Sequence, residues 1–529
     1  MNKMMLLGDE AIAQAALDAG ISGVYAYPGT PSTEITEYVQ LSKQAAGTAV
    51  RSNWSANEKT ALEAALGMSY AGKRAMVCMK HVGLNVAADA FMNSALTGVN
   101  GGLLITVADD PSMHSSQNEQ DSRFFGKFAM LPVLEPSSQQ EAYDMTGRAF
   151  VLSEKYKVPV LLRITTRLAH SRAGVQRSGI VPAAELKMPG DPRQFILLPA
   201  IARTRYKRLL SLQPEFRRES EISPFNWYLP AKSADKGVIT SGIAWNYFRE
   251  CYSGGGYPVS VLKVGQYPIP AALIREMAAT CREILVLEEG YPFIEEYMRG
   301  IFEQPVIIRG RMDGCLPEDG ELSPDLVATA LGMEALKVYE VPDLVVNRPP
   351  VLCNGCGHVD LYLALNEAMA VYGKGKVFSD IGCYTLGALP PYEAISSCVD
   401  MGASITMAKG AADAGLFPSA CVIGDSTFTH SGITGLLDAV NDHSPITVII
   451  SDNSTTGMTG GQKSSATGRI ESICLGVGVQ AEHVRNIVPL KKNHAANVDV
   501  LREELEYKGV SVIISQRECI QTSARRHKN

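Results

Sequence analysis

Two cysteines in the stretch VLCNGCGH, residues 351–358, have the spacing of a metal or redox site. A zinc site needs four ligands in tetrahedral geometry, and His358 would add one to Cys353 and Cys356. A thioredoxin-like pair needs a reactive thiolate at the start of a helix, and a [4Fe–4S] cluster needs four thiolates that need not be consecutive. The spacing is compatible with all three, and also with two buried thiols that bind nothing.

Two further cysteines follow apolar runs in the same part of the chain. Cys383 lies in DIGCYTLG at the end of one run, and Cys519 follows VSVIISQ, the last such run. Ligands of open α/β sheets bind outside the carboxyl ends of the strands, which is where we expect these two thiols. Cys78 and Cys421 lie inside apolar runs and are expected to be core residues.

A second group of candidate ligands consists of oxygen donors. ACVIGDSTFTHSGITGLLDAV is typical of a buried strand, a Gly-Asp turn and a helix, and ITVIISDNSTTGMTGGQ of the next strand with a polar loop. Asp425 and Asn453 would then lie at neighbouring strand ends, where Mg²⁺ takes a few oxygen ligands and shares a diphosphate. We expect the Thr455 carbonyl to be a further ligand. Gly424 would let the backbone approach the diphosphate, and a helix after Thr429 would point its N-terminus at this anion. Each motif alone is also typical of an ordinary turn.

These loops need a scaffold, and the apolar runs indicate its type. Short β-rich runs alternate with helical patterns over residues 1–190, 235–345 and 346–529, which predicts an α/β fold of open parallel sheets. The first and last segments look alike, so we expect one cofactor held between two similar domains, with a smaller α/β domain in the middle. Residues 191–234, rich in Arg, Lys and Pro, indicate an irregular basic connector with one helix, or an arm that contacts a partner.

Composition argues against several classes of function. The 529 residues carry a net charge of −6, which does not favour nucleic acid as a partner. No run approaches the ~20 apolar residues of a membrane span. The N-terminus leads directly into a helical pattern and does not resemble a signal peptide. Eleven scattered cysteines favour a reducing compartment, so we expect a cytoplasmic protein with no membrane partner.

Longer stretches resemble one family. GDS…DN is similar to the diphosphate motif of thiamine diphosphate enzymes. The chain as a whole resembles the large (alpha) subunit of indolepyruvate:ferredoxin oxidoreductase, in the 2-oxoacid:ferredoxin oxidoreductase superfamily. The matching stretches cover nearly all of residues 1–520 and include YPGTPSTEI, ANEKTALEAALGMSYAGKRAMVCMKHVGLNVAADAF, ADDPSMHSSQNEQDSR, VLEEGYPFIEE and RPPVLCNGCGH. The resemblance implies that 1–190 binds the pyrimidine, that 346–529 binds diphosphate and Mg²⁺, and that 235–345 is a transketolase C-terminal-like domain.

The resemblance also assigns the carboxylate that activates the cofactor. Thiamine diphosphate needs a carboxylate at N1′ of its aminopyrimidine so that the 4′ nitrogen can remove the C2 proton. An apolar site raises the pKa of such a carboxylate. Glu58 begins the stretch EKTALEAALG and matches the family's glutamate. Without the resemblance, Glu58 would be interpreted as an acid that stabilises the start of a helix. Glu63, one turn later, is the alternative candidate for the activating carboxylate.

Five further residues are candidates for contacts with substrate. The hydroxyl of Thr30, in the turn YPGTPS, can reach the cofactor or a substrate carboxylate. His81, in MKHVG, can relay a proton or hold that carboxylate, and a structural histidine is the alternative. His114 and Arg123 lie in a polar loop that we expect to cover the mouth of the site. Met458 stands where some relatives have an amide-bearing residue, and an apolar side chain there suits an aryl or alkyl 2-oxoacid.

The implied cofactors are thiamine diphosphate, Mg²⁺ and an iron–sulfur cluster. The resemblance places a [4Fe–4S] cluster on four thiols, those of Cys353, Cys356, Cys383 and Cys519. Zinc, or no metal at all, stays the alternative for these thiols. The expected neighbours of thiamine diphosphate, besides the residues already named, are Gly382, Cys383, Gly424 and Ser426.

The implied activity is oxidative decarboxylation of a 2-oxoacid, such as the arylpyruvate indolepyruvate, with coenzyme A to give acyl-CoA, CO₂ and reduced ferredoxin. The family's large subunit carries a ferredoxin-like tail with C-x-x-C-x-x-C-x-x-x-C-P, and this sequence contains no such run. We therefore expect electrons to leave through ferredoxin or a ferredoxin-like subunit, with a separate smaller beta subunit in an α₂β₂ or larger assembly. A non-oxidative thiamine diphosphate-dependent decarboxylase or synthase, and a catalytically silent scaffold of the same fold, are the alternatives.

Overall fold

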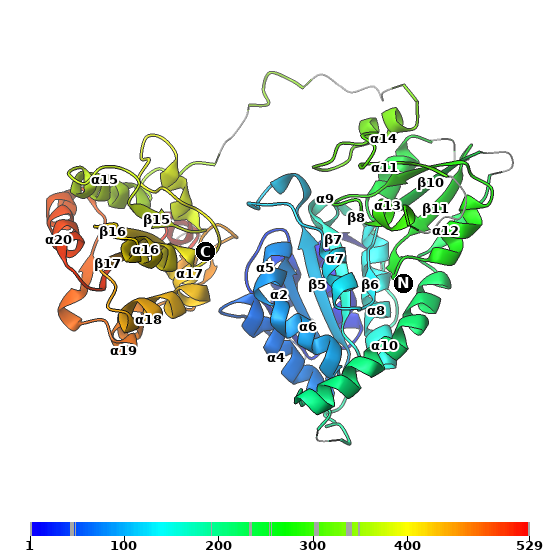
Figure 1. Cartoon of the computed structure of the whole chain (residues 1–529), viewed down its shortest axis with the longest axis horizontal. Helices are drawn as coiled ribbons and strands as arrows, with labels where there is room; N and C mark the ends of the chain where they lie inside the picture. Colours follow the sequence, from blue (N-terminus) through cyan, green and yellow to red (C-terminus); the bar gives the residue numbers. More distant parts are fainter. Residues whose placement is uncertain are drawn as a thin grey trace. The chain divides into compact units, whose positions relative to one another are not determined.

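The computed structural model in Figure 1 shows an α/β protein. It describes all residues except 1–2, 43–46, 48, 192, 232–234, 253, 255, 301–305, 335–340, 347–349 and 527–529. The chain divides into two compact units, residues 1–340 and 341–529. Each unit is built on parallel strands with helices between them, which confirms the predicted fold class.

A seven-stranded sheet, with the order β12-β6-β7-β5-β4-β2-β3, forms the first layer of the N-terminal unit. Its strands are β2 (Gly23–Ala26), β3 (Arg51–Trp54), β4 (Ala75–Lys80), β5 (Leu103–Asp109), β6 (Val133–Leu134), β7 (Val160–Thr165) and β12 (Gln266–Tyr267). Neighbouring strands run parallel except β12 and β6. Strands β5 and β7 are buried throughout, which explains why they read as continuous apolar runs.

Helices flank this sheet and begin at its carboxyl edge (Figure 1). They are α1 (Gly8–Asp18), α2 (Thr33–Leu41), α4 (Glu58–Tyr70), α5 (His81–Val86), α6 (Ala88–Thr97) and α8 (Gln139–Tyr156). Helix α1 packs against α2 and α8, and α4 packs against β2, β4 and α6. Helices α2, α4 and α5 follow β2, β3 and β4, so the turns that precede these helices lie at the edge where ligands of such sheets bind.

A second sheet completes the N-terminal unit. It has the order β14-β13-β10-β11-β9. Its strands are β9 (Trp227–Leu229), β10 (Lys236–Ser241), β11 (Ser260–Val264), β13 (Glu283–Leu287) and β14 (Ile307–Arg309). Strand β12 follows β11 in the chain but pairs with β6 of the first sheet. One apolar core runs through both sheets, which explains why residues 1–340 form a single unit.

The stretch 191–234 contains one helix, as expected, and this helix is long. Residues Pro199–Glu221 form one long helix, α10, which contacts α6 and α12 (Ala271–Ala278). Leu209 and Phe216 of α10 are buried, while much of its basic face is exposed. The helix is therefore amphipathic, with a narrow apolar side packed on the unit and a basic side toward solvent.

The C-terminal unit is built on a five-stranded parallel sheet with the order β15-β16-β17-β21-β20. The strands are β15 (Val377–Ser379), β16 (Ser419–Gly424), β17 (Ile446–Asp452), β20 (Val484–Ile487) and β21 (Ser511–Gln516). The main helices are α15 (Gly357–Met369), α16 (Ala403–Asp413), α18 (Ile433–Asn441), α19 (Ile470–Val477) and α20 (His494–Glu506). Two apolar clusters in the unit leave the carboxyl ends of β15, β16, β17 and β21 to polar loops.

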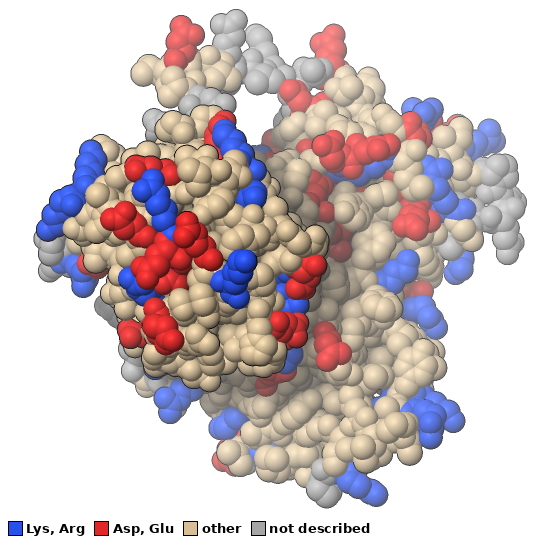
Figure 2. All heavy atoms as spheres, turned by 60° about the vertical axis from the view of Figure 1, so that its left-hand side comes forward, with Lys and Arg blue, Asp and Glu red and all other residues tan. Residues whose placement is uncertain are grey.

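Surface charge is mixed on the face drawn in Figure 2, where lysines and arginines alternate with acidic side chains. A protein that binds the phosphate backbone of nucleic acid usually presents a continuous basic surface, and this face has none. Within the described ranges, no helix has both the length and the apolar character needed to cross a bilayer.

Candidate active site

Asp425 is the strongest candidate for a metal ligand. It follows β16 directly and is buried, and its Oδ2 atom has no hydrogen-bond partner among the described residues. Burial, together with the nearby charge of Asp452, raises the pKa of Asp425 to about 7, against a hydrogen bond from Ser464 that lowers it. A buried carboxylate with an unsatisfied oxygen is unfavourable by itself, and a cation would satisfy it.

Asn453 and Thr455 lie at the adjacent strand end. Strands β16 and β17 are paired in parallel with Gly424 opposite Ser451, so Asp425 and Asn453 follow neighbouring strands as predicted. Asn453 Oδ1 accepts a hydrogen bond from the Thr455 N–H at 3.1 Å. The amide and the loop backbone are therefore held in place beside the end of β16.

The helix at this site starts earlier than we predicted. It begins at Asp425 itself, as the short α17 (Asp425–Thr427), and continues through a π-helical turn, Phe428–Gly432, into α18. We had expected a start after Thr429. The chain enters the helix directly from β16, so Asp425 and Ser426 form its first turn. The Ser426 Oγ atom lies 2.9 Å from Thr456 Oγ1, which links this turn to the loop after β17.

Gly382 and Gly424 leave room for an aromatic ring. A Cβ atom would lie 2.3 Å from Tyr384 Cε1 if added at Gly382, and 2.6 Å from the same atom if added at Gly424. The Tyr384 hydroxyl donates to Asp380, which also accepts from Ser404 Oγ at 2.6 Å. Our reading of the sequence missed Asp380 and Tyr384, although Asp380 ends an apolar run just as Asp425 does.

The four candidate thiols line one cavity of about 90 Å³, together with Asn453. They belong to Cys353, Cys356, Cys383 and Cys519. Burial, followed by the charges of the other three thiols, raises the pKa of Cys383 to about 12. The Cys519 N–H donates to the Asn453 carbonyl at 3.1 Å. The thiols and the loop after β17 therefore share one compact region of the C-terminal unit.

The distances between these thiols argue against a preformed zinc site. With Zn–S bonds of about 2.3 Å, tetrahedral sulfurs lie roughly 3.8 Å apart. Among the described residues, only Asp9, Glu34 and His170 bring three ligand atoms of His, Cys, Asp or Glu within 4.8 Å of one another. The four cysteines are therefore spread more widely than one zinc ion requires.

His358 is fixed at the rim of the cavity, where its Nδ1 atom lies 3.0 Å from Cys356 Sγ. Burial lowers the pKa of His358 to about 4, so the ring is neutral near pH 7. A neutral ring can accept the hydrogen bond of the thiol. The other ring nitrogen, Nε2, is buried and has no hydrogen-bond partner among the described residues, so the contact with Cys356 satisfies only one side of the ring.

Glu58 and Glu63 occupy opposite environments on α4. Glu58 is the first residue of the helix and is only 4% exposed. It packs against Gly83, where an added Cβ would lie 2.7 Å from Glu58 Oε1. Glu63 is exposed and forms an ion pair with Lys59. Burial therefore favours Glu58 as the carboxylate of an apolar cofactor site.

Thr30 and His81 lie in the turns at the carboxyl edge of the first sheet. His81 is 1% exposed; its Nε2 lies 3.1 Å from the Asn118 carbonyl, and its Nδ1 has no hydrogen-bond partner among the described residues. The Thr30 carbonyl accepts from Ser115 Oγ at 3.0 Å. Lys80, which our reading of the sequence missed, donates to the Ser115 carbonyl at 2.8 Å. Burial lowers the pKa of Lys80, against the charges of Asp110 and Glu58.

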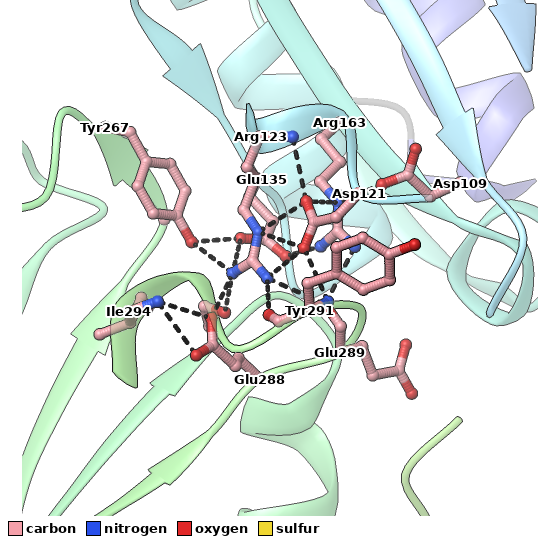
Figure 3. A network of polar contacts seen from close by, with 12 residues as sticks. Asp109, Asp121, Arg123, Glu135, Arg163, Tyr267, Glu288, Glu289, Tyr291 and Ile294 are labelled. Atoms are coloured by element: carbon pink, nitrogen blue, oxygen red, sulfur yellow. Dashed lines mark hydrogen bonds and ion pairs between the residues drawn. The ribbon is translucent and has the colours of Figure 1, made fainter. Parts of the chain in front are cut away.

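The predicted position of Arg123 was wrong, because this side chain does not lie in a loop at a site mouth. It belongs to α7 (Ser122–Phe128) and is fully buried. Figure 3 shows its guanidinium, with that of Arg163, among acids from several segments. It donates to Asp121 and to Glu288, the latter at 2.7 Å, and to the carbonyls of Glu289 and Tyr291. Its donors are used inside the protein, and a contact of Arg123 with substrate stays a prediction.

His114 and Met458 are exposed. The His114 Nε2 atom lies 3.0 Å from Glu321 Oε2, so this histidine bridges to the segment after β14. Met458 is 53% exposed in the turn that follows β18 (Thr455–Thr456). Their roles toward a substrate stay predictions.

Comparison with known proteins agrees with this arrangement. Residues 14–190 match the family described as "Pyruvate flavodoxin/ferredoxin oxidoreductase, thiamine diP-bdg". Residues 380–513 match "Thiamine pyrophosphate enzyme, C-terminal TPP binding domain". A solved 2-oxoglutarate:ferredoxin oxidoreductase from Magnetococcus marinus shares the fold, with a TM-score of 0.51 and 18% identity over 62% of this chain and 65% of that one. The chain is thus a member of the thiamine diphosphate-dependent oxidoreductases.

Two relatives narrow the assignment. "Indolepyruvate oxidoreductase subunit IorA" of Archaeoglobus fulgidus is 40% identical over 98% of this chain and 86% of its own length. The protein of the same name from Methanothermobacter marburgensis is 39% identical over 98% of this chain and 87% of its own length. The chain therefore belongs to the family of indolepyruvate oxidoreductase subunit IorA, as the resemblance predicted.

Proposed function

We propose that this chain is the catalytic subunit of an enzyme that oxidatively decarboxylates an arylpyruvate such as indolepyruvate. Coenzyme A takes the acyl group, and ferredoxin or a ferredoxin-like subunit takes the electrons. The relatives' name supports the oxidoreductase activity and the substrate class. The observation that carries the proposal is the single cavity lined by four thiols and by Asn453, next to the buried Asp425.

Asp425, Asn453 and the Thr455 carbonyl would hold Mg²⁺ and, through it, a diphosphate. The orphan Oδ2 of Asp425 and the ordered amide of Asn453 are the donor types that Mg²⁺ prefers. Gly382, Cys383, Gly424 and Ser426 would form the surrounding loops. When bound there, thiamine diphosphate would supply the electron sink that decarboxylation requires.

Glu58 would hold a proton at N1′ of the aminopyrimidine. Its burial keeps water away from that hydrogen bond, which makes the exchange of a proton with a ring nitrogen more effective. The Thr30 hydroxyl and the unpartnered Nδ1 of His81 would orient the substrate carboxylate. His114 and Met458 are specificity candidates.

Cys353, Cys356, Cys383 and Cys519 would bind a [4Fe–4S] cluster that receives the electrons. A cluster at this place favours the oxidative reaction over a non-oxidative decarboxylase, which has no use for it. The subunit designation of the relatives implies a partner, which we take to be a smaller beta subunit in an α₂β₂ or larger assembly. Function with ferredoxin and oxygen-sensitive thiols suits the cytoplasm.

Calorimetry of the full-length protein with thiamine diphosphate tests the cofactor site. We expect binding in the presence of Mg²⁺ that EDTA abolishes and that Asp425→Ala weakens by more than ~100-fold, since this substitution removes a charged ligand. Asp413→Ala, at an exposed acid of the same unit, should bind as the wild type does. Equal affinity of Asp425→Ala and wild type would refute the assignment.

A further inference from the structure

A second group of metal-ligand side chains lies in the N-terminal unit and has no part in the proposed function. Asp9 and Glu34 stand near the starts of α1 and α2, and His170 ends α9 (Thr166–His170). Their ligand atoms all lie within 4.8 Å of one another. The three residues are far apart in the sequence, so it is the fold that gathers them.

Asp9 is the unusual member of this group. It is 0% exposed, and both of its carboxylate oxygens are buried with no hydrogen-bond partner among the described residues. Burial, followed by the charges of Glu34 and Glu10, raises the pKa of Asp9 well above its ordinary value. Buried polar groups almost always have partners, so two orphan oxygens on one side chain indicate an unseen proton or cation.

The other two ligands open the group to solvent. The side chains of His170 and Glu34 are 35% and 37% exposed, and His170 Nε2 lies 3.5 Å from Glu34 Oε2. At Gly8, an added Cβ would lie 2.3 Å from the Leu168 carbonyl oxygen, so the start of α1 is pressed against α9. Asp9 is therefore the buried end of the group, and the partly exposed Glu34 and His170 form its side toward solvent.

Neighbouring charged groups are already engaged. Glu10 accepts from the Leu7 N–H at 2.8 Å and lies 3.3 Å from Arg172. Asp110, whose charge acts on His170, accepts from Thr166 Oγ1 at 2.6 Å and Ser116 Oγ at 2.7 Å. Nearby, burial raises the pKa of Cys78 far enough that its thiol stays protonated. Asp9, Glu34 and His170 are thus the donors left for an ion.

We propose that Asp9, Glu34 and His170 bind a divalent transition-metal ion through two carboxylates and one imidazole. Carboxylate ligands suit manganese and imidazole suits the later first-row metals, so the mixed set fits an ion of the manganese–iron class. The ion would tie together the starts of α1 and α2 and the end of α9. Thr33 of α2 accepts from the Gly29 N–H at 3.0 Å, so the ion would also steady the turn that carries Thr30.

Titration of the full-length protein with MnCl₂ tests the site, with free Mn²⁺ measured by EPR and no thiamine diphosphate present. Mn²⁺ is the probe because thiolates bind it weakly, so the cysteines do not compete. Wild type should bind one tight equivalent more than Asp9→Asn, which keeps the size of the side chain and removes its charge. Asp89→Asn, at an exposed acid of α6, should bind as wild type does. The Asp425 site is present in all three proteins and cancels in the comparison.

The same number of Mn²⁺ ions on Asp9→Asn and wild type would overturn the proposal and identify Asp9 as a carboxyl that stays protonated. If Asp9→Asn does not fold, the partly exposed His170→Gln replaces it. Mn²⁺ should then raise the midpoint of thermal unfolding of wild type by more than that of His170→Gln, since the Asp425 site is present in both proteins. An equal rise in both proteins would overturn the proposal as well.

Discussion

Buried charge occurs both in the N-terminal unit, around Arg123, and at the carboxyl edge of the C-terminal sheet, around Asp425. In the first region, the guanidinium groups of Arg123 and Arg163 meet acids and carbonyls at hydrogen-bond distance (Figure 3). In the second, Asp425 keeps an oxygen that no described residue satisfies. Both regions carry strongly perturbed pKa values, so burial alone does not mark a functional site. What differs is the compensation of charge. Asp109 Oδ1 and Glu289 Oε2 of the first region also lack hydrogen-bond partners among the described residues, but arginines act on both carboxylates. Asp425 is influenced by another acid, Asp452, and by no such cation among the described residues.

The largest effect should come from Glu58→Gln, which keeps the size of the side chain and replaces the carboxyl group, which can exchange a proton, with an amide that cannot. We expect kcat to fall by ~10²–10⁴-fold, the range of general acid–base catalysis, while thiamine diphosphate still binds. Steady-state kinetics of the assembled enzyme would measure this loss. Glu63→Gln is the matched control and should stay near wild type, because Glu63 is exposed. Equal losses of kcat in the two variants would show that the burial of Glu58 on α4 does not identify it as the acid that activates the cofactor.

Next in size is the loss of iron from Cys383→Ser. A missing thiolate should remove most of the cluster, and with it the visible absorbance of the anaerobic protein and its reduction of low-potential dyes. Cys398→Ser, at an exposed cysteine of the same unit, should keep both. Stoichiometric zinc in wild type, with no iron, would contradict the cluster.

Arg123→Met tests the region in which arginines compensate the buried acids. Removal of the guanidinium leaves several acids buried without their cation, which typically costs ~3–5 kcal/mol of unfolding free energy. Denaturant unfolding would measure this, and the surviving folded fraction should keep the KM of wild type for the 2-oxoacid. A raised KM with unchanged stability would instead support the predicted contact of Arg123 with substrate.

A smaller effect is the pH dependence of Mg²⁺ binding. Mg²⁺ needs the ionised form of Asp425, and the pKa of that carboxyl is about 7 in the metal-free protein. As pH falls through 7, protons compete for the carboxylate, so the apparent affinity for Mg²⁺ should drop by ~10-fold between pH 7.5 and 6. Calorimetric titrations at both pH values would show it. An affinity that rises as pH falls would mean that Asp425 is not a ligand.

The sequence predicted the buried strands and their order along the chain well, because parallel strands buried on both faces are continuous apolar runs. The residues that follow these strands, such as Asp425, Asn453 and Cys383, could be predicted as site residues for the same reason. The network around Arg123 could not be predicted in the same way, because Glu288, one of its acidic partners, lies 165 residues away in the chain. A helix within residues 191–234 was predicted, but its packing through Leu209 and Phe216 was not, because these two apolar residues stand among many Arg and Lys residues.

The central claim is that the cysteine-lined cavity takes up the electrons released when a 2-oxoacid is decarboxylated. Its most direct test is the anaerobic visible and EPR spectrum of the chain assembled with its smaller subunit, with thiamine diphosphate, Mg²⁺ and coenzyme A present. On addition of indolepyruvate, CO₂ should be released while the visible absorbance bleaches and the signal of a reduced cluster appears. Release of CO₂ with free aldehyde as product, and with no change in either spectrum, would contradict the claim.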